Sequence, residues 1–280
     1  MPGIAVLALF AAALPNAVVL RPVANMYSKA SEDSDVASQA IYGANVSVLE
    51  QKDGWARIRT FDQYTGWMPL SALRNGEPYA AHGRVAEVQS LFAHIYREPD
   101  VTKHAPLITV PFESKLEVIA EPADNTRWIQ VRLPDDRSGW LQSGDIAFDV
   151  KPLSTPEMLE FSKRFLGLPY TWGGTSTFGY DCSGFAQMLC RRRGINLPRD
   201  AQPQADWSGL KPVEREDLVP GDLLYFGTSE KHITHTGIYL GDGKFINATR
   251  AQTPTRQAPM VRIDDLSDTT EHLVTMRRVK

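Results

Sequence analysis

The sequence is poor in cysteine: its 280 residues include only Cys182 and Cys190. Two cysteines exclude a disulfide framework. If both lie on one helix, their separation of eight residues places them about 12 Å apart along its axis, too far for a bridge. The sequence also lacks C-x-x-C and H-E-x-x-H patterns, and its six histidines are scattered. We therefore expect no metal ion and no other cofactor.

The sequence also lacks a strong charge and a long apolar run. Its formal net charge of -3 gives no electrostatic argument for binding nucleic acid or an anionic membrane surface. The run from Ile4 to Leu14 is too short to span a bilayer, and no later stretch is better. We expect neither a nucleic-acid partner nor a membrane span.

The apolar run near the N-terminus has the length of a signal peptide. It is followed by Pro15-Asn16-Ala17, but no Lys or Arg precedes it, so the match to an export signal is partial. We interpret residues 1–17 as a signal segment and expect export to the periplasm or cell wall. The alternatives are a wrongly assigned start codon and a cytoplasmic protein whose chain begins with an apolar strand.

Four tryptophans indicate an internal repeat. Trp55 and Trp67 are twelve residues apart, as are Trp128 and Trp140, and the two pairs are offset by 73 residues. Within each pair, apolar and polar residues alternate and turn residues precede a G-W dipeptide, which predicts a β-hairpin. We expect most of these tryptophans to be core residues.

The two repeated units, residues 18–76 and 77–149, resemble bacterial SH3-like domains, which are small β-barrels common in cell-wall enzymes. The resemblance implies wall binding or a role in shaping a neighbouring active site, and a purely structural spacer is the alternative. In relatives with this architecture, a tyrosine in the turn before the closing G-W reaches the catalytic cleft. Here that residue is Tyr64.

The third region, residues 150–280, begins with two predicted helices. Ser154 and Glu157 have the spacing of a capping box, and the helix that follows stops near Gly167. A second helix runs roughly from Cys182 to Arg193 and contains Cys190, which we interpret as a small buried hydrophobe. Extended segments are expected at 197–200, 223–226, 235–240 and 244–248.

A loop rich in glycine and aromatic residues leads from Tyr170 to Asp181-Cys182-Ser183. Asp181 suits a helix N-cap, which would place Cys182 at a helix N-terminus, where the macrodipole favours an anion. A thiol at that position loses its proton more easily than a free cysteine does. We therefore hypothesise that Cys182 is a nucleophile. We expect the glycines and Trp172 to bend the loop and pack its base.

A cysteine nucleophile needs a base and a group that orients it. His235 begins one predicted strand and Asn247 ends the next, whereas His232 lies in a polar run that we interpret as a loop. A two-residue turn at Asp242-Gly243 would put His235 and Asn247 on opposite faces. A three-residue loop with a bulge would put them on the same face, and Gly243 suits its last position. We predict the three-residue loop.

This part of the sequence resembles the NlpC/P60 family of papain-like cysteine peptidases. The matching segments are Y-T-W-G-G with D-C-S-G-F, then L-P-R-D, P-G-D-L-L-Y-F and H-T-G-I-Y-L-G-D-G-K-F-I-N-A. The resemblance implies an α+β papain-like catalytic domain preceded by the two SH3-like barrels. Asn247 stands where close relatives often carry histidine, although an amide carbonyl can also accept an imidazole N–H.

The resemblance also implies roles for individual residues. Cys182 would be the nucleophile, His235 the base, Asn247 the third polar residue and Tyr170 the residue on the oxyanion side. The substrate-binding residues would be Asp181, Ser183, Tyr64, Trp172 and Asp200. Asp181, with Tyr64, would bind the free α-ammonium of the substrate's L-Ala, in addition to the N-cap role of Asp181.

The activity implied by the resemblance is a γ-D-glutamyl-L-diamino-acid endopeptidase. It would act as a monomer on peptides of the form L-Ala-γ-D-Glu-diamino acid, where the diamino acid is diaminopimelate or lysine, and it would prefer a free N-terminus. Two alternatives remain open: an amidase or acyltransferase of the same fold, and a non-catalytic wall-binding protein.

Overall fold

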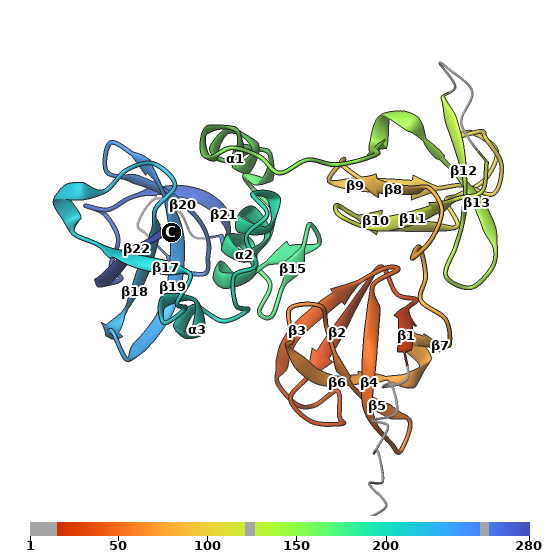
Figure 1. Ribbon diagram of the computed structural model, residues 1–280, viewed down its shortest axis with the longest axis horizontal. Helices are drawn as coiled ribbons and strands as arrows, with labels where there is room; N and C mark the ends of the chain where they lie inside the picture. The colour runs from red at the N-terminus through yellow and green to blue at the C-terminus, as the bar shows by residue number, and fades with distance from the viewer. Residues whose placement is uncertain (1–15, 121–126, 253–257) are drawn as a thin grey trace, which may run out of the picture.

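A computed structural model describes residues 16–120, 127–252 and 258–280, which form three units along the chain (Figure 1). Most of the predicted signal segment, residues 1–15, lies outside the described residues. Asn16 and Ala17 belong to the first strand, β1, where Ala17 pairs with Val46 and Asn75. The predicted boundary between residues 17 and 18 therefore falls inside a strand.

The first unit is one antiparallel sheet that surrounds a small core. Its strand order is β3-β2-β6-β5-β4-β1-β7. Met26, Ile58 and Met68 are fully buried at its centre. The elements are β1 (Asn16–Val19), β2 (Val23–Tyr27), β3 (Val36–Ile41), β4 (Asn45–Lys52), β5 (Trp55–Arg59), β6 (Thr65–Pro69), the 3-10 turn η1 (Leu70–Ala72) and β7 (Leu73–Asn75).

The second unit has a five-stranded antiparallel sheet, β13-β12-β11-β8-β14, and a separate β10-β9 ladder. Leu116, Val131 and Leu141 are fully buried in its core. The elements are β8 (Val85–Val88), β9 (Phe92–Ile95), β10 (Ile108–Pro111), β11 (Lys115–Val118), β12 (Trp128–Arg132), β13 (Ser138–Gln142), the 3-10 turn η2 (Ser143–Asp145) and β14 (Ile146–Ala147).

The predicted repeat is confirmed. Strands β5 and β6 recur as β12 and β13 with bounds offset by 73 residues, and the pairing of Trp55 with Pro69 recurs as Trp128 with Gln142. The hairpin turns also match, because Gln63 and Asp136 both have φ of 66°.

The expectation that the repeat tryptophans are core residues is wrong. All four are only partly buried. Along each strand successive side chains point to opposite faces, and the inward positions of β5 belong to Ala56 and Ile58. The tryptophans occupy the other face, where the Trp55 ring packs edge-on against Tyr27 with centroids 5.6 Å apart.

The third unit packs helices on a six-stranded antiparallel sheet of order β17-β22-β18-β19-β20-β21, an α+β arrangement. Helix α1 (Thr155–Ser162) is followed by η3 (Lys163–Phe165), the short hairpin β15 (Thr175–Ser176) and β16 (Gly179–Tyr180), α2 (Cys182–Arg192) and α3 (Ala201–Ala205). The remaining elements are β17 (Leu210–Val213), η4 (Arg215–Asp217), β18 (Leu223–Ser229), β19 (His232–Gly241), β20 (Lys244–Thr249), β21 (Met260–Asp265) and β22 (Leu273–Val279).

Several local predictions in this unit can be compared with the structure. The Glu157 carboxylate accepts hydrogen bonds from the backbone N–H and the hydroxyl of Ser154, at 2.8 and 2.6 Å, so the start of α1 is confirmed. The strands predicted at 223–226, 235–240 and 244–248 are the centre of the sheet. His232, interpreted as loop, is instead the exposed first residue of β19. Helix α3 and strands β17, β21 and β22 were not predicted.

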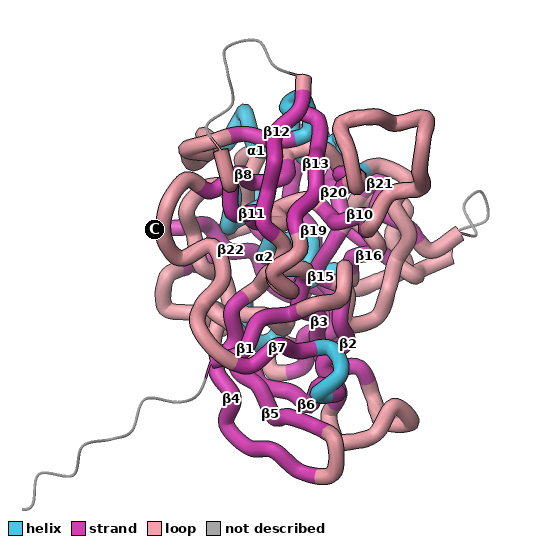
Figure 2. Tube along the Cα trace, turned by 90° about the vertical axis from the view of Figure 1, so that its right-hand side faces the viewer, coloured by secondary structure: helices cyan, strands magenta, loops and turns pink. Residues whose placement is uncertain are grey.

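Helix α2 lies between the six-stranded sheet and the two β units (Figure 1). It packs against β19 and β20 on one side. The short hairpin beside it reaches the first unit, where β15 lies next to β3 and the Thr175 N–H bonds to Gln39 Oε1 at 3.3 Å (Figure 2). Among the described residues, no helix is long and apolar enough to cross a membrane.

Candidate active site

Cys182 is the first residue of α2 and is only 8% exposed. The Asp181 carboxylate caps this helix by accepting the Gly184 N–H at 2.7 Å, as predicted. Burial and the neighbouring charge of Asp181 raise the pKa of Cys182 to about 12, although backbone N–H groups of Thr236 and Ser183 hydrogen-bond to the sulfur and oppose the increase. The expectation of an acidic thiol is therefore wrong for this structure, because desolvation outweighs the helix terminus.

The glycines of the preceding loop allow it to close tightly against α2. A Cβ on Gly184 would lie 2.2 Å from the Gly174 carbonyl oxygen, and a Cβ on Gly174 would lie 2.3 Å from that of Gly179. Only glycine fits such backbone contacts. Trp172 does not pack the base of the loop as expected, since its side chain is 64% exposed.

His235 and Asn247 come together across β19 and β20. His235 Nε2 lies 3.0 Å from Asn247 Oδ1, and both residues are buried. The predicted three-residue loop is wrong, because Gly241 pairs with Lys244 across a two-residue turn. The register nevertheless shifts after Gly241, so that Tyr239 pairs with Phe245 and Leu240 is left as a bulge. The bulge puts His235 and Asn247 on one face.

A second layer of polar groups holds Asn247. Its Nδ2 donates to Asp264 Oδ2 at 3.1 Å, and the Arg262 guanidinium donates to both Asp264 oxygens at 2.9 Å. With its amide N–H held there, Asn247 presents its carbonyl oxygen to His235. Asp264 and Arg262 were not found from the sequence, since only the pairing of β20 with β21 brings them to this position.

Burial lowers the pKa of His235, while the negative charge of Glu271 opposes that decrease. Glu271 Oε2 lies 3.5 Å from His235 Nε2. The hydrogen bond to Asn247 and the charge of Asp264 also raise the pKa of His235, and Arg262 lowers it. The imidazole is therefore neutral at physiological pH and available as a base.

Tyr170 lies near enough to the thiol for a charge on Cys182 to affect its phenol. It is partly buried and forms a bridge with Tyr180, the last residue of β16. Burial raises the pKa of Tyr170, and a negative charge on Cys182 would raise it further. The phenol therefore remains protonated. A protonated phenol can donate a hydrogen bond.

Arg199 connects β3, the loop before α2 and the first turn of α2. It was not predicted from the sequence. It is 2% exposed, and its guanidinium donates to the two oxygens of Asp181 at 3.0 and 2.6 Å. It also donates to Ser183 Oγ at 3.0 Å and, from Nε, to Ser38 Oγ in β3 at 3.0 Å. One signal was available in the sequence: Arg199 follows the apolar pair Leu197-Pro198. An arginine buried with such a pair requires a negatively charged partner.

The first unit also reaches the rim of the site. Tyr64 OH donates to Asp200 Oδ2 at 2.9 Å, and burial raises the pKa of both groups, that of Tyr64 to about 12. Asp62 accepts a hydrogen bond from Gln187 of α2 at 3.0 Å. The structure therefore brings Tyr64 and Asp200 together.

Among the described residues, no three His, Cys, Asp or Glu side chains are grouped so that they could hold a metal ion. A cysteine at a helix N-terminus, packed against an antiparallel sheet that presents a histidine and an asparagine, defines the class of papain-like cysteine peptidases.

Comparisons with known proteins agree with this class. The NlpC/P60 family matches residues 167–267, and the bacterial dipeptidyl-peptidase Sh3 domain matches residues 26–73. A Bacillus cereus protein named gamma-D-glutamyl-L-lysine dipeptidyl-peptidase is 32% identical over 80% of this chain and 70% of its own length. A Bacillus subtilis protein of the same name is 28% identical over 78% of this chain and 74% of its own.

A solved structure extends the similarity to the fold. The crystal structure of an NlpC/P60 family protein from Bacillus cereus covers 94% of this chain and 99% of its own, with a TM-score of 0.79 and 26% identity. The chain belongs to the NlpC/P60 family of cysteine peptidases, with an SH3-like region at its N-terminal end.

Proposed function

We propose that the protein hydrolyses the bond between γ-D-glutamate and the diamino acid of peptidoglycan stem peptides, with Cys182 as nucleophile and His235 as base. The names of two relatives that cover most of this chain support the substrate class. One observation supports the catalytic roles of these residues. The Cys182 sulfur lies against the N–H of Thr236, the neighbour of His235, and His235 in turn bonds to Asn247.

The reaction starts from a neutral thiol and a neutral imidazole, since burial disfavours the charged form of each. Sulfur attacks the γ-carbonyl carbon while His235 takes the thiol proton. The C–N bond then breaks, and the imidazolium protonates the departing amine of diaminopimelate or lysine. His235 next removes a proton from water, and the hydroxide cleaves the thioester to restore the thiol. Asn247 orients the ring throughout.

The tetrahedral oxyanion needs hydrogen-bond donors. We assign this role to the backbone N–H of Cys182 at the start of α2 and to the protonated hydroxyl of Tyr170. Donors of this kind are typically worth about 3–4 kcal/mol in the transition state. Both groups belong to the ends of one loop, which Gly174 and Gly184 allow to close.

The free amino group of the substrate is assigned to Asp200, together with Tyr64. Both oxygens of Asp181 are already bound by Arg199, and one also caps α2. Tyr64 uses one oxygen of Asp200, and a carboxylate can accept several hydrogen bonds. In this proposal Asp181 and Ser183 form the wall of the pocket behind the thiol, and the exposed Trp172 lies at its mouth.

We further propose the domain boundaries predicted from the sequence, except that the first SH3-like domain begins at Asn16. The second β unit, 77–149, is assigned as a second SH3-like barrel because its hairpin repeats that of the first. Export to the periplasm or cell wall and a monomeric state are parts of the same proposal.

The proposal is tested with mass spectrometry of products from the parent protein and from Cys182→Ala. The substrates are L-Ala-γ-D-Glu-diaminopimelate, its N-acetylated form and intact sacculi. We expect the parent to release L-Ala-D-Glu, and Cys182→Ala to release none above background. Products cleaved at another bond would support a different amidase of this fold. Wall binding without hydrolysis by the parent would support a binding protein and overturn the proposal.

A further inference from the structure

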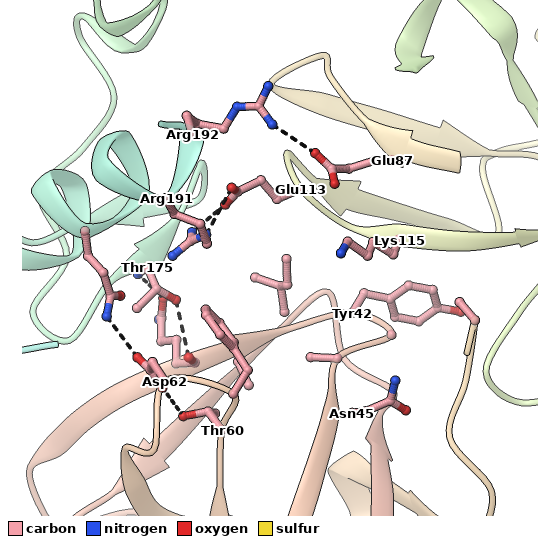
Figure 3. Close-up of a pocket in the computed structure, with 18 of the residues that line it drawn as sticks. Tyr42, Asn45, Thr60, Asp62, Glu87, Glu113, Lys115, Thr175, Arg191 and Arg192 are labelled. Atoms are coloured by element: carbon pink, nitrogen blue, oxygen red, sulfur yellow. Dashed lines mark hydrogen bonds and ion pairs between the residues drawn. The ribbon is translucent and has the colours of Figure 1, made fainter. Parts of the chain in front are cut away.

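A cavity of about 630 Å³ lies where the three units meet. It is lined by β3 and β4 of the first unit, by the ends of β8 and β11 of the second, and by the C-terminal half of α2 (Figure 3). A volume of this size is in the range of small-molecule sites, about 300–1,000 Å³.

This cavity is separate from the proposed active site. Neither Cys182, His235 nor Asn247 lines it. Helix α2 connects the two places, because it begins with Cys182 and presents Arg191 and Arg192 to the cavity. Gln187 is the residue of α2 nearest to Cys182 that lines the cavity. Five residues of helix span about 7.5 Å, so a ligand in the cavity does not touch the thiol.

The negative side chains in the cavity wall already have partners. Glu113 accepts two hydrogen bonds from Arg191, at 3.1 and 2.5 Å. Glu87 accepts one from Arg192 at 3.2 Å, and Asp62 is held by Thr60 at 2.5 Å as well as by Gln187 (Figure 3). These carboxylates therefore have little capacity to attract a cation.

The cavity wall carries more positive than negative side chains. Four cations line the cavity, Lys115, Lys151, Arg191 and Arg192, against the three carboxylates. Within the described part of the chain, the ammonium groups of Lys115 and Lys151 form no ion pair within 4 Å, although the charge of Lys115 also acts on Glu87, its partner across the β11–β8 ladder. The Lys115 ammonium points into the cavity between Glu113 and Tyr42 (Figure 3). The uncompensated charge is therefore positive.

The rest of the wall suits a compact organic ligand rather than a simple ion. Phe61, which is 64% exposed, and the partly buried Ile41 provide apolar surface on the side of the first unit, whereas Tyr42 and Tyr79 are almost fully buried in the wall. Small-molecule sites combine such a surface with a few polar groups that fix orientation. Lys115 is the cationic group at the side of the second unit.

We propose that this cavity binds a short peptide that carries at least one carboxylate, with the carboxylate at Lys115 and the body of the peptide against Ile41 and Phe61. Such a ligand bridges the three units and contacts the far end of the helix that carries Cys182. The choice of probe rests on the proposed function, since its product L-Ala-D-Glu is a dipeptide with two carboxylates. The binding site itself does not depend on the proposed function.

The test is a titration of full-length Cys182→Ala protein with L-Ala-D-Glu, followed by backbone amide NMR signals. We expect two groups of signals to shift, one near Ser183 and Thr236 and one near Tyr42, Lys115 and Arg192. Lys115→Glu should weaken the second binding event at least tenfold and leave the first unchanged. Lys52→Glu, which makes the same charge change outside the cavity, is the matched control. A dipeptide with both carboxylates amidated should also bind the cavity at least tenfold more weakly.

The outcomes separate this inference from the proposed function. Shifts confined to the region of Ser183 and Thr236 would overturn the cavity site and leave the peptidase proposal intact. Cavity shifts that persist in Lys115→Glu would overturn the assigned carboxylate position. Absence of hydrolysis by the parent, with cavity shifts present, would overturn only the peptidase proposal.

Discussion

His235 is buried, and its surroundings set the pH at which it can accept a proton. Desolvation lowers its pKa from the ordinary value of 6.5, and Glu271, Asn247 and Asp264 limit that decrease. The base form is the active form in the proposed mechanism. Its population therefore falls only when the pH drops below the lowered pKa.

We accordingly expect the acid limb of kcat/KM to lie below pH 6.5. Glu271→Gln removes a charge that favours the imidazolium, so the limb should move to still lower pH. The measurement is a pH profile of tripeptide hydrolysis, with Glu230→Gln, an exposed glutamate before β19, as the control. An acid limb at or above pH 6.5, or a shift to higher pH in Glu271→Gln, would contradict this explanation.

The thiol gives a second prediction at the scale of one residue. Because burial raises the pKa of Cys182 to about 12, its alkylation by iodoacetamide should be slow at pH 7 and should still accelerate above pH 9. The rate is measured in a Cys190→Ala background, so that only one thiol reacts. A rate that reaches a plateau by pH 6 would indicate a stable thiolate–imidazolium pair and would refute the neutral resting state.

Residues with a local sequence pattern could be predicted, and those held by distant contacts could not. Asp181 and Cys182 stand at a recognisable helix start, and the N-cap bond of Asp181 is confirmed. Arg199 depends on Ser38, which lies 161 positions earlier, so no window of sequence indicates their contact. Burial of Cys182 likewise results from packing across the chain, which is why the direction of its pKa shift was predicted wrongly.

At the scale of an element, the β19–β20 hairpin shows how one residue determines a site. Its two-residue turn at Asp242-Gly243 has positive φ at both positions, 51° and 73°, the geometry that suits the twist of a hairpin. By itself this turn would separate His235 from Asn247. The Leu240 bulge reverses that effect. The predicted register was therefore right, but the bulge was expected in the loop, with Gly243 in its last position, and lies instead at Leu240.

Helix α2 and its loop give a prediction at the same scale. Gly184→Ala places a Cβ against the Gly174 carbonyl, and such overpacking typically costs about 1–3 kcal/mol. It should also displace the N-terminus of α2 and lower kcat. The readouts are the free energy of unfolding in urea and tripeptide hydrolysis. Gly144→Ala is the control, because nothing lies within 4 Å of its Cβ position; equal effects of the two changes would refute the argument.

At the scale of the molecule, the N-terminal unit contributes directly to the site of the C-terminal one. Tyr64, Asp62 and Ser38 all bond to residues of the third unit. The second unit instead holds the far end of α2, through Glu87 and Glu113. The first unit is therefore expected to affect substrate choice.

Tyr64→Phe tests this contribution. It removes a hydrogen bond to a carboxylate, which is worth about 1.5 kcal/mol or more, so KM for the free tripeptide should rise roughly tenfold. Hydrolysis of the N-acetylated peptide should not change, because it has no ammonium to bind. Tyr27→Phe, which removes another tyrosine hydroxyl of the first unit, should match the parent. Equal loss on both peptides would contradict a role in amine recognition.

The bond between Arg199 and Ser38 also bears on biosynthesis. A ribosome completes β3 long before it reaches residue 199, and domains generally fold as units, the N-terminal one first. The acceptor for Arg199 is therefore already in place when the catalytic unit emerges. Until that unit docks, the guanidinium lacks one of its buried partners and the cap of α2 lacks its support. A chain that lacks β3 would thus carry Cys182 without the Ser38 acceptor for Arg199.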